Sequence, residues 1–464
     1  MLERVHRSAA LASLLSFLLP GLGQAMTGAR RRGLLIATPA LLLVAGAGAI
    51  WVFDRGLFVS AALSPPVLLG IVALSLGVFV YRFWAIVDAY VVSRRSGAGK
   101  GGWPARIASV TVLVALLAIT TFSHGWVAAV GLSAHQTLTT VFTPDGPPGG
   151  FGDLVAPSTT TSPTPATSAE VVETPAPTPS PTPRPEWAAD GRLNVLLIGT
   201  DAGPGRWSMR ADAIILVSVE IDTGRVAAFS LPRYTTRVPL PEPAASAFEC
   251  RCLVEPINAL YVFASERPDF FPGGEARGLL ALSGAIGTLF DVHVDGMAVV
   301  DLNGFVRMVD AIGGVTVDVP AAVYDPAYPD PDGVMAVEIY FAPGEQRMDG
   351  WHALAYARTR HQDGDVSRMQ RQQHVIKALQ HELSCDLLGR LPAVLEVARD
   401  ALWTNLPLED LPEMLRIDPG PVESHSLFDI HNPALTDDDL ARMRAAVDDA
   451  FDGPAPPDPD PLEC

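Results

Sequence analysis

The chain has 464 residues, of which 48% are hydrophobic, and it carries a formal net charge of -18. This length accommodates two or three domains, or one domain together with membrane spans. A chain this acidic lacks the overall basic character typical of nucleic-acid binders, so we expect no nucleic-acid partner.

Apolar residues concentrate in the first third of the chain. Three stretches reach the roughly 20 residues that a helix needs to cross a bilayer, namely Gly33–Phe53, Pro66–Val92 and Ile107–Leu132. Basic residues gather at 27–32 and 93–106, whereas the loop at 54–64 contains only Arg55. The positive-inside rule therefore predicts a multi-pass cell-membrane protein whose chain beyond Leu132 is extracytoplasmic.

A shorter apolar segment, Ser8–Met26, precedes these three spans and contains Pro20-Gly21. It resembles the Pro-Gly-Leu-Gly-Gln opening of small bacterial membrane modules with paired helices. The segment is a fourth span, a re-entrant turn or an anchor helix broken at Pro20-Gly21. We expect Asp88, near the cytoplasmic end of the second span, to be an interfacial residue.

The stretch from Thr143 to Pro185 is rich in Pro, Thr and Ser, which favours an extended spacer over a packed core. We expect a transmembrane helical region at 1–132 with three or four spans, an extracytoplasmic linker at 133–190, a globular domain at 191–452 and a Pro-rich acidic tail at 453–464.

The globular region alternates between strand and helix patterns. The predicted strands are 194–199, 211–221, 225–232, 293–301, 315–320 and 353–359, with a hairpin turn at Asp222–Gly224. The predicted helices are Arg277–Phe290, 302–314 and Asp365–Leu383, followed by a helical, acidic remainder to about Phe451. The fold class is therefore α/β, with a mixed central β-sheet flanked by helices and an all-α transmembrane region before it.

The four cysteines are Cys250, Cys252, Cys385 and Cys464, and their spacing does not suggest zinc. Outside the cell the even count permits two disulfides, whose pairing the sequence leaves open. We expect structural pairing rather than redox chemistry.

Three segments concentrate ionisable groups beside predicted strand ends. They contain Asp201, Arg206, Arg210 and Asp212; Arg233 and Arg237; and Arg358, Arg360, Asp365, Arg368, Arg371 and Gln372. In the third, Arg358 and Arg360 alternate on a predicted strand, and Asp365 is placed to cap the next helix. Guanidinium groups bind phosphate bidentately and keep their charge, so a diphosphate is the expected ligand.

Asp201 and Asp212 flank the first segment, and a divalent ion that bridges phosphate oxygens takes one or two carboxylates with water. Simpler interpretations remain. On these interpretations the Arg and Asp residues would be surface ion pairs, and Arg237 and Arg371 would be solvated. Asp201 would only bond its own turn, and His361 would be structural. The residues alone favour an anion-binding domain and leave catalysis open.

Several ordered motifs resemble the LytR-CpsA-Psr family over roughly residues 192 to 383. They are NVLLIGTDAGPGRWSMRADAIILVS, SLPR, INAL, NGFVRMVDAIGGVTVDVP and ALAYARTRHQDGDVSRMQRQQ. The resemblance implies a membrane-anchored phosphotransferase. Its donor would be a polyprenyl-pyrophosphate-linked glycopolymer, its acceptor peptidoglycan or a related glycan, and its cofactor Mg²⁺, with Mn²⁺ as the alternative.

The same resemblance assigns Asp201 and Asp212 as metal ligands. It assigns pyrophosphate binding to Arg210, Arg233, Arg358, Arg360, Arg368 and Gln372, with Arg237 as a weaker transfer. The acceptor hydroxyl would attack the glycan-proximal phosphorus and release polyprenyl phosphate. The general base would be Asp201, Asp212 or Asp365, unless metal activation makes a dedicated base unnecessary.

The sequence also departs from the family pattern. Tyr234 stands where many members have Asp, Ala213 stands where they have Thr, and most members have a single N-terminal span. Two alternatives to a transferase therefore remain. One is a non-catalytic module that binds polyprenyl phosphate or glycan, and the other is a pyrophosphatase acting on the lipid-linked glycan.

Overall fold

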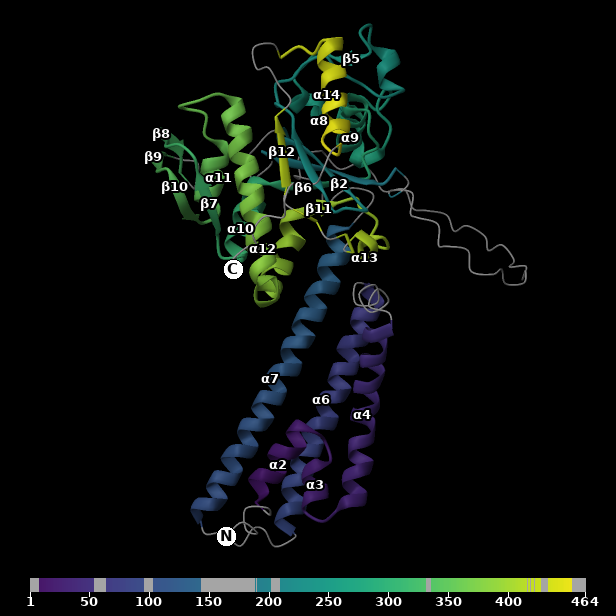
Figure 1. Ribbon diagram of the computed structural model, residues 1–464, viewed down its shortest axis with the longest axis vertical. Helices are drawn as coiled ribbons and strands as arrows, with labels where there is room; N and C mark the ends of the chain where they lie inside the picture. Colours follow the sequence, from purple (N-terminus) through teal and green to yellow (C-terminus); the bar gives the residue numbers. More distant parts are fainter. Residues whose placement is uncertain are drawn as a thin grey trace, which may run out of the picture. The chain divides into compact units, whose positions relative to one another are not determined.

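The computed structural model describes residues 8–53, 64–95, 103–142, 188, 190–201, 209–330, 335–414, 416–417, 419–420, 422–426 and 433–452. The chain divides into a helical unit, mainly Met1–Thr139, and a sheet unit, mainly Thr140–Cys464 (Figure 1). The Pro/Thr/Ser-rich stretch at 143–185 and the tail at 453–464 lie outside the described residues.

The helical unit contains three helices long and apolar enough to cross a membrane. They are α4 (Arg30–Phe53), α6 (Pro65–Ser93) and α7 (Trp103–Val141). Each contains one of the three predicted spans. Most of their large apolar side chains are exposed to the surroundings, as expected for helices whose solvent is lipid rather than water.

The segment before α4 is a helical hairpin of α2 (Ala9–Leu18) and α3 (Leu22–Met26). Ser8 caps α2 by accepting a hydrogen bond from the Leu11 amide at 3.1 Å. The chain reverses at Gly21, whose φ of +95° suits glycine. A 10-residue helix rises only about 15 Å, half of a bilayer core. The structure thus shows two short helices interrupted at Pro20-Gly21, and their placement in the membrane stays a prediction.

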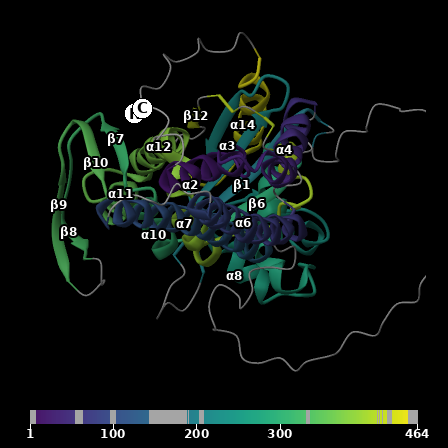
Figure 2. The same cartoon turned by 90° about the horizontal axis from the view of Figure 1, so that it is seen from below.

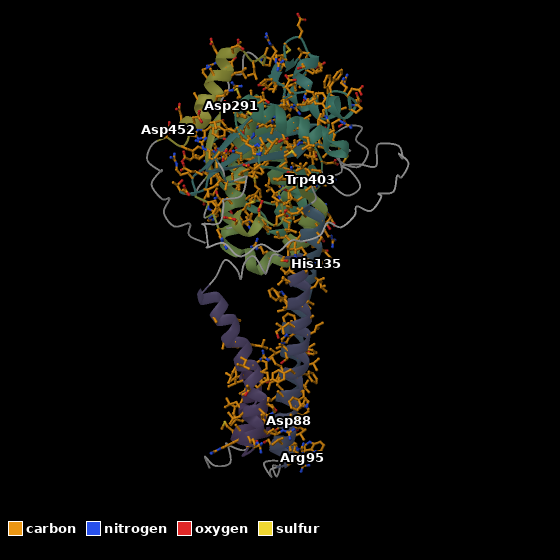
Figure 3. The ribbon with its side chains drawn as sticks, turned by 90° about the vertical axis from the view of Figure 1, so that its right-hand side faces the viewer. Asp88, Arg95, His135, Asp291, Trp403 and Asp452 are labelled. Carbon is orange, nitrogen blue, oxygen red and sulfur yellow. A yellow bond between two sulfur atoms is a disulfide. The ribbon has the colours of Figure 1, made fainter. Side chains whose placement is uncertain are left out.

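A buried polar network joins this hairpin to α6. The fully buried Gln24 side chain donates to the Ala85 carbonyl at 3.0 Å and to the Asp88 carboxylate at 3.1 Å. Ser16 donates to Gln24 Oε1 at 2.7 Å, and Arg32 pairs with Asp88 at 2.6 Å. Asp88 lies near the same end of the unit as Arg95 (Figure 3), yet its side chain is only 11% exposed. It therefore belongs to a hydrogen-bonded network with Gln24 and Arg32, and its interfacial position stays a prediction.

The sheet unit is built on a six-stranded sheet of order β11-β6-β1-β2-β3-β12. The strands are β1 (Arg192–Thr200), β2 (Ala211–Glu220), β3 (Val226–Ser230), β6 (Gly296–Asp301), β11 (Leu402–Thr404) and β12 (Val422–Ser426). The pairs β1–β6 and β3–β12 are parallel, whereas β1–β2, β2–β3 and β6–β11 are antiparallel. The predicted mixed sheet is confirmed.

Helices cover both faces of this sheet (Figure 1). On one face, α9 (Arg277–Phe290) and α14 (Asp437–Asp449) enclose a core that includes Leu196, Ile198 and Phe229. On the other lie α10 (Leu302–Ala311) and α12 (Asp365–Ala401). Burying such apolar side chains stabilises the fold by about 25 cal/mol per Å².

A second core lies beside α12 and includes Val317, Ile339 and Tyr356. Around it are the two-stranded pairs β7–β10 and β8–β9 together with α11 (Figure 2). Their bounds are Val315–Val319 (β7), Val323–Pro329 (β8), Ala336–Phe341 (β9), Gly344–Met348 (β10) and Gly350–Arg358 (α11). The remaining elements of the sheet unit are shorter. They are Val238–Pro239 (β4), Ala244–Ala247 (η3), Cys252–Leu253 (β5), Ile257–Ala259 (η4), Leu260–Ser265 (α8) and Gly274–Ala276 (η5). One further helix, α13, spans Leu411–Met414.

Three secondary-structure predictions are wrong. Residues 353–359 were expected to form a strand, but they belong to α11, which Asp349 caps by accepting from the His352 amide at 2.9 Å. The N-cap of α12 is Gly364 rather than Asp365, which is the first helical residue. The region after 383 contains not only helix but also the two outermost strands, β11 and β12.

Candidate functional site

Three strand ends meet at one edge of the six-stranded sheet. Because β1, β2 and β3 are antiparallel neighbours, the end of β1, the start of β2 and the end of β3 share this edge. Asp201 follows β1, and its amide donates to the Arg210 carbonyl at 3.1 Å. The Asp201 carboxylate accepts from the Arg210 amide at 2.8 Å. Asp201 thus closes its own loop, as the simpler interpretation expects; Arg206 lies outside the described residues.

A β-bulge positions Asp212. Gly199 pairs with Ala213 and Thr200 pairs with Ala211, so Asp212 is the extra residue of β2. Bulges redirect side chains and are frequent beside active sites. The Asp212 carboxylate accepts a hydrogen bond from the Arg233 guanidinium, and the two side chains are 17% and 21% exposed. Two of the predicted site residues are therefore in direct contact.

Arg233 is held in place through the backbone of its loop. The Leu231 amide donates to the Ile214 carbonyl at 2.9 Å, which continues the β2–β3 pairing past Ser230. The Asn258 amide donates to the Arg233 carbonyl at 3.0 Å. The INAL motif is thus a structural support for the loop that carries this arginine.

The third segment reaches the same edge through α12. The Gln373 side chain donates to the Ser230 hydroxyl at 3.1 Å, and both residues are buried. Arg368 lies one to two turns earlier on α12 and is only 4% exposed, while Gln372 is half-buried. This contact places the first turns of α12 beside the end of β3, where Arg233 follows.

Arg371 has a different role from the one its sequence position indicates. Sequence reasoning allowed it to be solvated, but it is only 4% exposed. Its guanidinium donates to the Tyr356 carbonyl at 2.8 Å and to the Thr359 carbonyl, and it pairs with Asp363 at 2.6 and 3.0 Å. Arg371 therefore fastens the end of α11 and the following loop to α12.

This fastened loop carries Arg358 and Arg360. Arg358 is the last residue of α11 and Arg360 lies just beyond it, so the two arginines do not alternate on a strand as predicted. Arg358 hydrogen-bonds the Tyr328 hydroxyl. The pKa of Tyr328 is raised, because burial has a larger effect than the charge of Arg358, which acts in the opposite direction. Thr359 anchors the same turn by donating to the Asp325 carboxylate at 2.6 Å. Arg360 is exposed.

The predicted arginines differ in exposure. Arg368 is buried, Arg233 and Arg358 are half-buried, and Arg210, Arg237 and Arg360 are exposed. Arg237 has a φ of +55°, which is uncommon for this residue type. The described contacts join Asp212 to Arg233 and bring α12 to the same strand end. They do not by themselves place Arg237 with this group.

The carboxylates suit a cation bound together with phosphate. Among the described residues no group of three or more His, Cys, Asp or Glu side chains is arranged to hold a metal ion. Magnesium bound through phosphate oxygens and water needs only one or two carboxylates. Asp201 and Asp212 stand at neighbouring strand ends, where their carboxylates accept hydrogen bonds from the Arg210 amide and the Arg233 guanidinium, and their role as metal ligands stays a prediction.

Sequence reasoning named Arg371 without its role, and it missed the other residues that hold the arginine loop, chiefly Asp363, Asp325 and Tyr328. The available signal was the spacing of Arg371, three residues after Arg368 on a helix that also has an apolar face. No local pattern indicates that Asp363 and two carbonyl groups will surround this guanidinium.

Comparison with known proteins gives a consistent result. A model of the LytR_cpsA_psr family matches residues 159–424. "Biofilm regulatory protein A" of Streptococcus mutans is 26% identical over 236 residues, which cover 48% of this chain and 52% of that protein. The Bacillus subtilis "Polyisoprenyl-teichoic acid--peptidoglycan teichoic acid transferase TagV" is 28% identical over 200 residues, which cover 42% and 45%. The chain thus spans about half the length of these curated relatives.

The solved structures are more distant. The crystal structure of B. subtilis TagV superposes with a TM-score of 0.42 and 23% identity, covering 56% of this chain and 97% of that one.

Proposed function

The chain belongs to the LytR_cpsA_psr family, and we propose that it is a phosphotransferase that moves a polyprenyl-pyrophosphate-linked glycopolymer to a cell-wall acceptor such as peptidoglycan. The observation that carries this proposal is the Asp212–Arg233 ion pair at the ends of β2 and β3. The first turns of α12, which contain Arg368, contact the end of β3 through the Gln373–Ser230 hydrogen bond. The names of relatives, which include teichoic acid transferases, support the same class of reaction.

The donor would bind through its pyrophosphate. Arg233, Arg358 and Arg368 come from three different elements, and their planar guanidinium groups match phosphate oxygens bidentately. The exposed Arg210 and Arg360 and the half-buried Gln372 would complete the binding set. A dianionic ligand offsets the mutual repulsion of these charges, which is why the residues favour pyrophosphate over a neutral glycan.

The transfer step needs charge stabilisation more than covalent chemistry. An acceptor hydroxyl attacks the glycan-proximal phosphorus, the new phosphorus–oxygen bond forms, and the pyrophosphate bridge breaks. Polyprenyl phosphate leaves with the bond electrons, and the hydroxyl proton passes to a base, for which Asp201, Asp212 and Asp365 are the candidates. Arg233 and Arg368 would stabilise charge on the transferring group.

A bound Mg²⁺, held by Asp201 and Asp212, would supply Lewis-acid stabilisation of the phosphoryl oxygens. Tyr234 takes the place of the family's usual aspartate, so the base falls to the remaining carboxylates. The Asp212–Arg233 contact would also keep the arginine oriented while substrate is absent.

We further propose that the sheet unit is extracytoplasmic. Three apolar helices precede it and provide a membrane anchor, and the basic residues at 27–32 and 93–106 favour a cytoplasmic position for those loops. Membrane anchoring would keep the unit near the lipid-linked donor and the wall acceptor.

The test uses the full chain in lipid nanodiscs with a lipid-pyrophosphate glycan, Mg²⁺ and peptidoglycan fragments. Wild-type protein should form a new phosphodiester and release polyprenyl phosphate in equal amounts. Asp212→Asn, Asp212→Ala and Arg360→Ala should each lower the rate, by about 100-fold or more for Asp212. Arg442→Ala, which removes an exposed arginine of α14, is the matched control and should leave the rate unchanged.

Two other outcomes would replace this proposal. Tight binding without either product would make the chain a binding module. Release of polyprenyl phosphate without a new phosphodiester would make it a pyrophosphatase.

A further inference from the structure

A disulfide joins Cys250 and Cys252 in the β4–β5 hairpin, across the single residue Arg251. The side chains of Cys385 and Cys464 lie outside the described residues. In the chain-entropy model, the stability that a disulfide adds grows with the length of the loop it closes. A bond between residues two apart closes a very short loop, so stabilisation is a weak reason for its presence.

The residue between the two cysteines is held in an unfavourable conformation. Arg251 has a φ of +52°, a left-handed conformation that a side chain with a Cβ adopts at a cost. Its amide donates to the Phe248 carbonyl at 2.9 Å, its carbonyl accepts from the Leu240 amide at 3.1 Å, and its guanidinium pairs with Glu242. Opening the disulfide would remove one constraint on this backbone, and the hydrogen bonds to Phe248 and Leu240 would remain.

The two sulfur-bearing residues differ in access. Cys250 is exposed, whereas Cys252 is only 5% exposed. A hollow of about 370 Å³ lies over them, lined by Phe248, Glu249, Cys250, Cys252 and Val254. Val254 is 60% exposed. An accessible disulfide beside exposed apolar side chains is one that another protein can reach.

We propose that Cys250–Cys252 is a thiol–disulfide exchange site for a protein dithiol. Exposed disulfides, and those that hold strain, are the labile ones. The partner's thiolate attacks the Cys250 sulfur, the Cys250–Cys252 bond breaks, and Cys252 leaves as a thiolate that takes up a proton. The partner's second thiolate then attacks the mixed disulfide and releases the Cys250 thiol. Two electrons pass from the partner, which becomes the disulfide.

This site is connected to the candidate phosphate site by backbone contacts. Cys252 pairs with Pro239 and Leu253 with Val238 in the β4–β5 hairpin. The residues after this hairpin donate to the Arg233 loop, from Ile257 to the Thr235 carbonyl at 2.8 Å and from Asn258 to the Arg233 carbonyl at 3.0 Å. The exchange reaction itself does not depend on the proposed transferase activity.

The first experiment treats the full chain in detergent with dithiothreitol under native conditions, followed by alkylation and mass mapping. We expect both Cys250 and Cys252 to be alkylated while intrinsic fluorescence stays native. Arg251→Asn should shift the equilibrium several-fold towards the disulfide, because asparagine tolerates the left-handed conformation better. Glu242→Gln removes only the ion pair with Arg251 and should match wild type.

The second experiment replaces dithiothreitol with reduced thioredoxin as the protein dithiol. Val254→Ser should slow reduction by thioredoxin and leave reduction by dithiothreitol unchanged, because only the protein needs the apolar surface. Three results would overturn the proposal: alkylation only after unfolding, mapping of Cys250 to Cys385 or Cys464, or equal behaviour of Arg251→Asn and wild type.

Discussion

The helical unit and the sheet unit both contain Arg–Asp contacts, but their charge balance differs. In the helical unit, Arg32, Asp88 and Gln24 form a network in which each partner is supplied by the chain. In the sheet unit, Asp212 pairs with Arg233, and the proposed pyrophosphate site adds Arg210, Arg358, Arg360 and Arg368. A balanced network needs no ligand, whereas the proposed site, with more arginines than carboxylates, would need an anion to balance its charge. Burial alone does not separate the two cases.

Arg371 tests this distinction most severely, because it is a buried arginine whose charge is balanced by Asp363 and which lies in the same unit as the candidate site. Arg371→Met leaves Asp363 and two carbonyl groups without their donor, and we expect unfolding to become easier by about 3 kcal/mol. The rate of transfer should fall by about 100-fold, because a misplaced loop also misplaces Arg358 and Arg360. Urea denaturation and the transfer rate measure the two effects.

Arg371→Lys sharpens the same test. It keeps the charge but cannot donate to Tyr356, Thr359 and Asp363 together. It should recover part of the stability while the transfer rate stays low. If the Arg371→Met variant transferred at the wild-type rate, the loop that carries Arg358 and Arg360 would not need the contacts of Arg371.

Asp295 is a buried carboxylate of another kind, since it accepts from the Asn194 amide at 2.7 Å rather than pairing with an arginine. Its side chain is 2% exposed, and burial raises its pKa from 3.8 to about 6. The folded state therefore holds this proton more tightly than the unfolded state does. Stability from Asp295 is present below about pH 4 and is lost as the pH rises through about 6. The loss is about 3 kcal/mol.

Asp295→Asn should remove this loss, so that the variant is more stable than wild type at pH 7.5 but not at pH 4. Thermal unfolding at the two pH values measures the difference. Asp291→Asn, at the exposed end of α9 (Figure 3), is the control and should keep the pH dependence of wild type. An identical pH profile for Asp295→Asn and wild type would contradict the prediction.

Gln24→Leu breaks the balanced network of the helical unit. It removes the hydrogen bonds to Ser16, Ala85 and Asp88, and buried polar contacts among membrane helices contribute about 1–2 kcal/mol. We expect a loss of that size in stability towards denaturing detergent. The affinity for a pyrophosphate lipid should not change. Thr121→Val, an exposed substitution on α7, should have almost no effect.

The elements that local signals define were predictable from the sequence. The helix Arg277–Phe290 and the β2–β3 hairpin follow from an amphipathic pattern and a short polar turn. The segment 353–359 was misassigned because a short apolar run fits a buried strand as well as a helix, although three alanines favour helix. The outer strands β11 and β12 were missed because they are strands only through pairing with β6 and β3, which lie far away in sequence.

The candidate site divides in the same way. The residue types and their grouping indicate an anion site from sequence alone. The different roles of Arg371 and Arg368, however, depend on which of the two guanidinium groups the fold surrounds with carbonyl groups. Tertiary contacts between α11 and α12 decide which arginine is surrounded, and the spacing of residues along one helix does not predict these contacts.

The position of β11 and β12 at the two margins of the sheet has a consequence for biogenesis. During synthesis, β3 and β6 are complete long before residues 402–426 emerge, so the nascent sheet has two open edges with unpaired backbone groups. Such edges pair readily with other chains. Translation that stops before Leu402 should therefore yield an aggregation-prone product, and factors that protect exposed strands of a nascent chain would act within this interval.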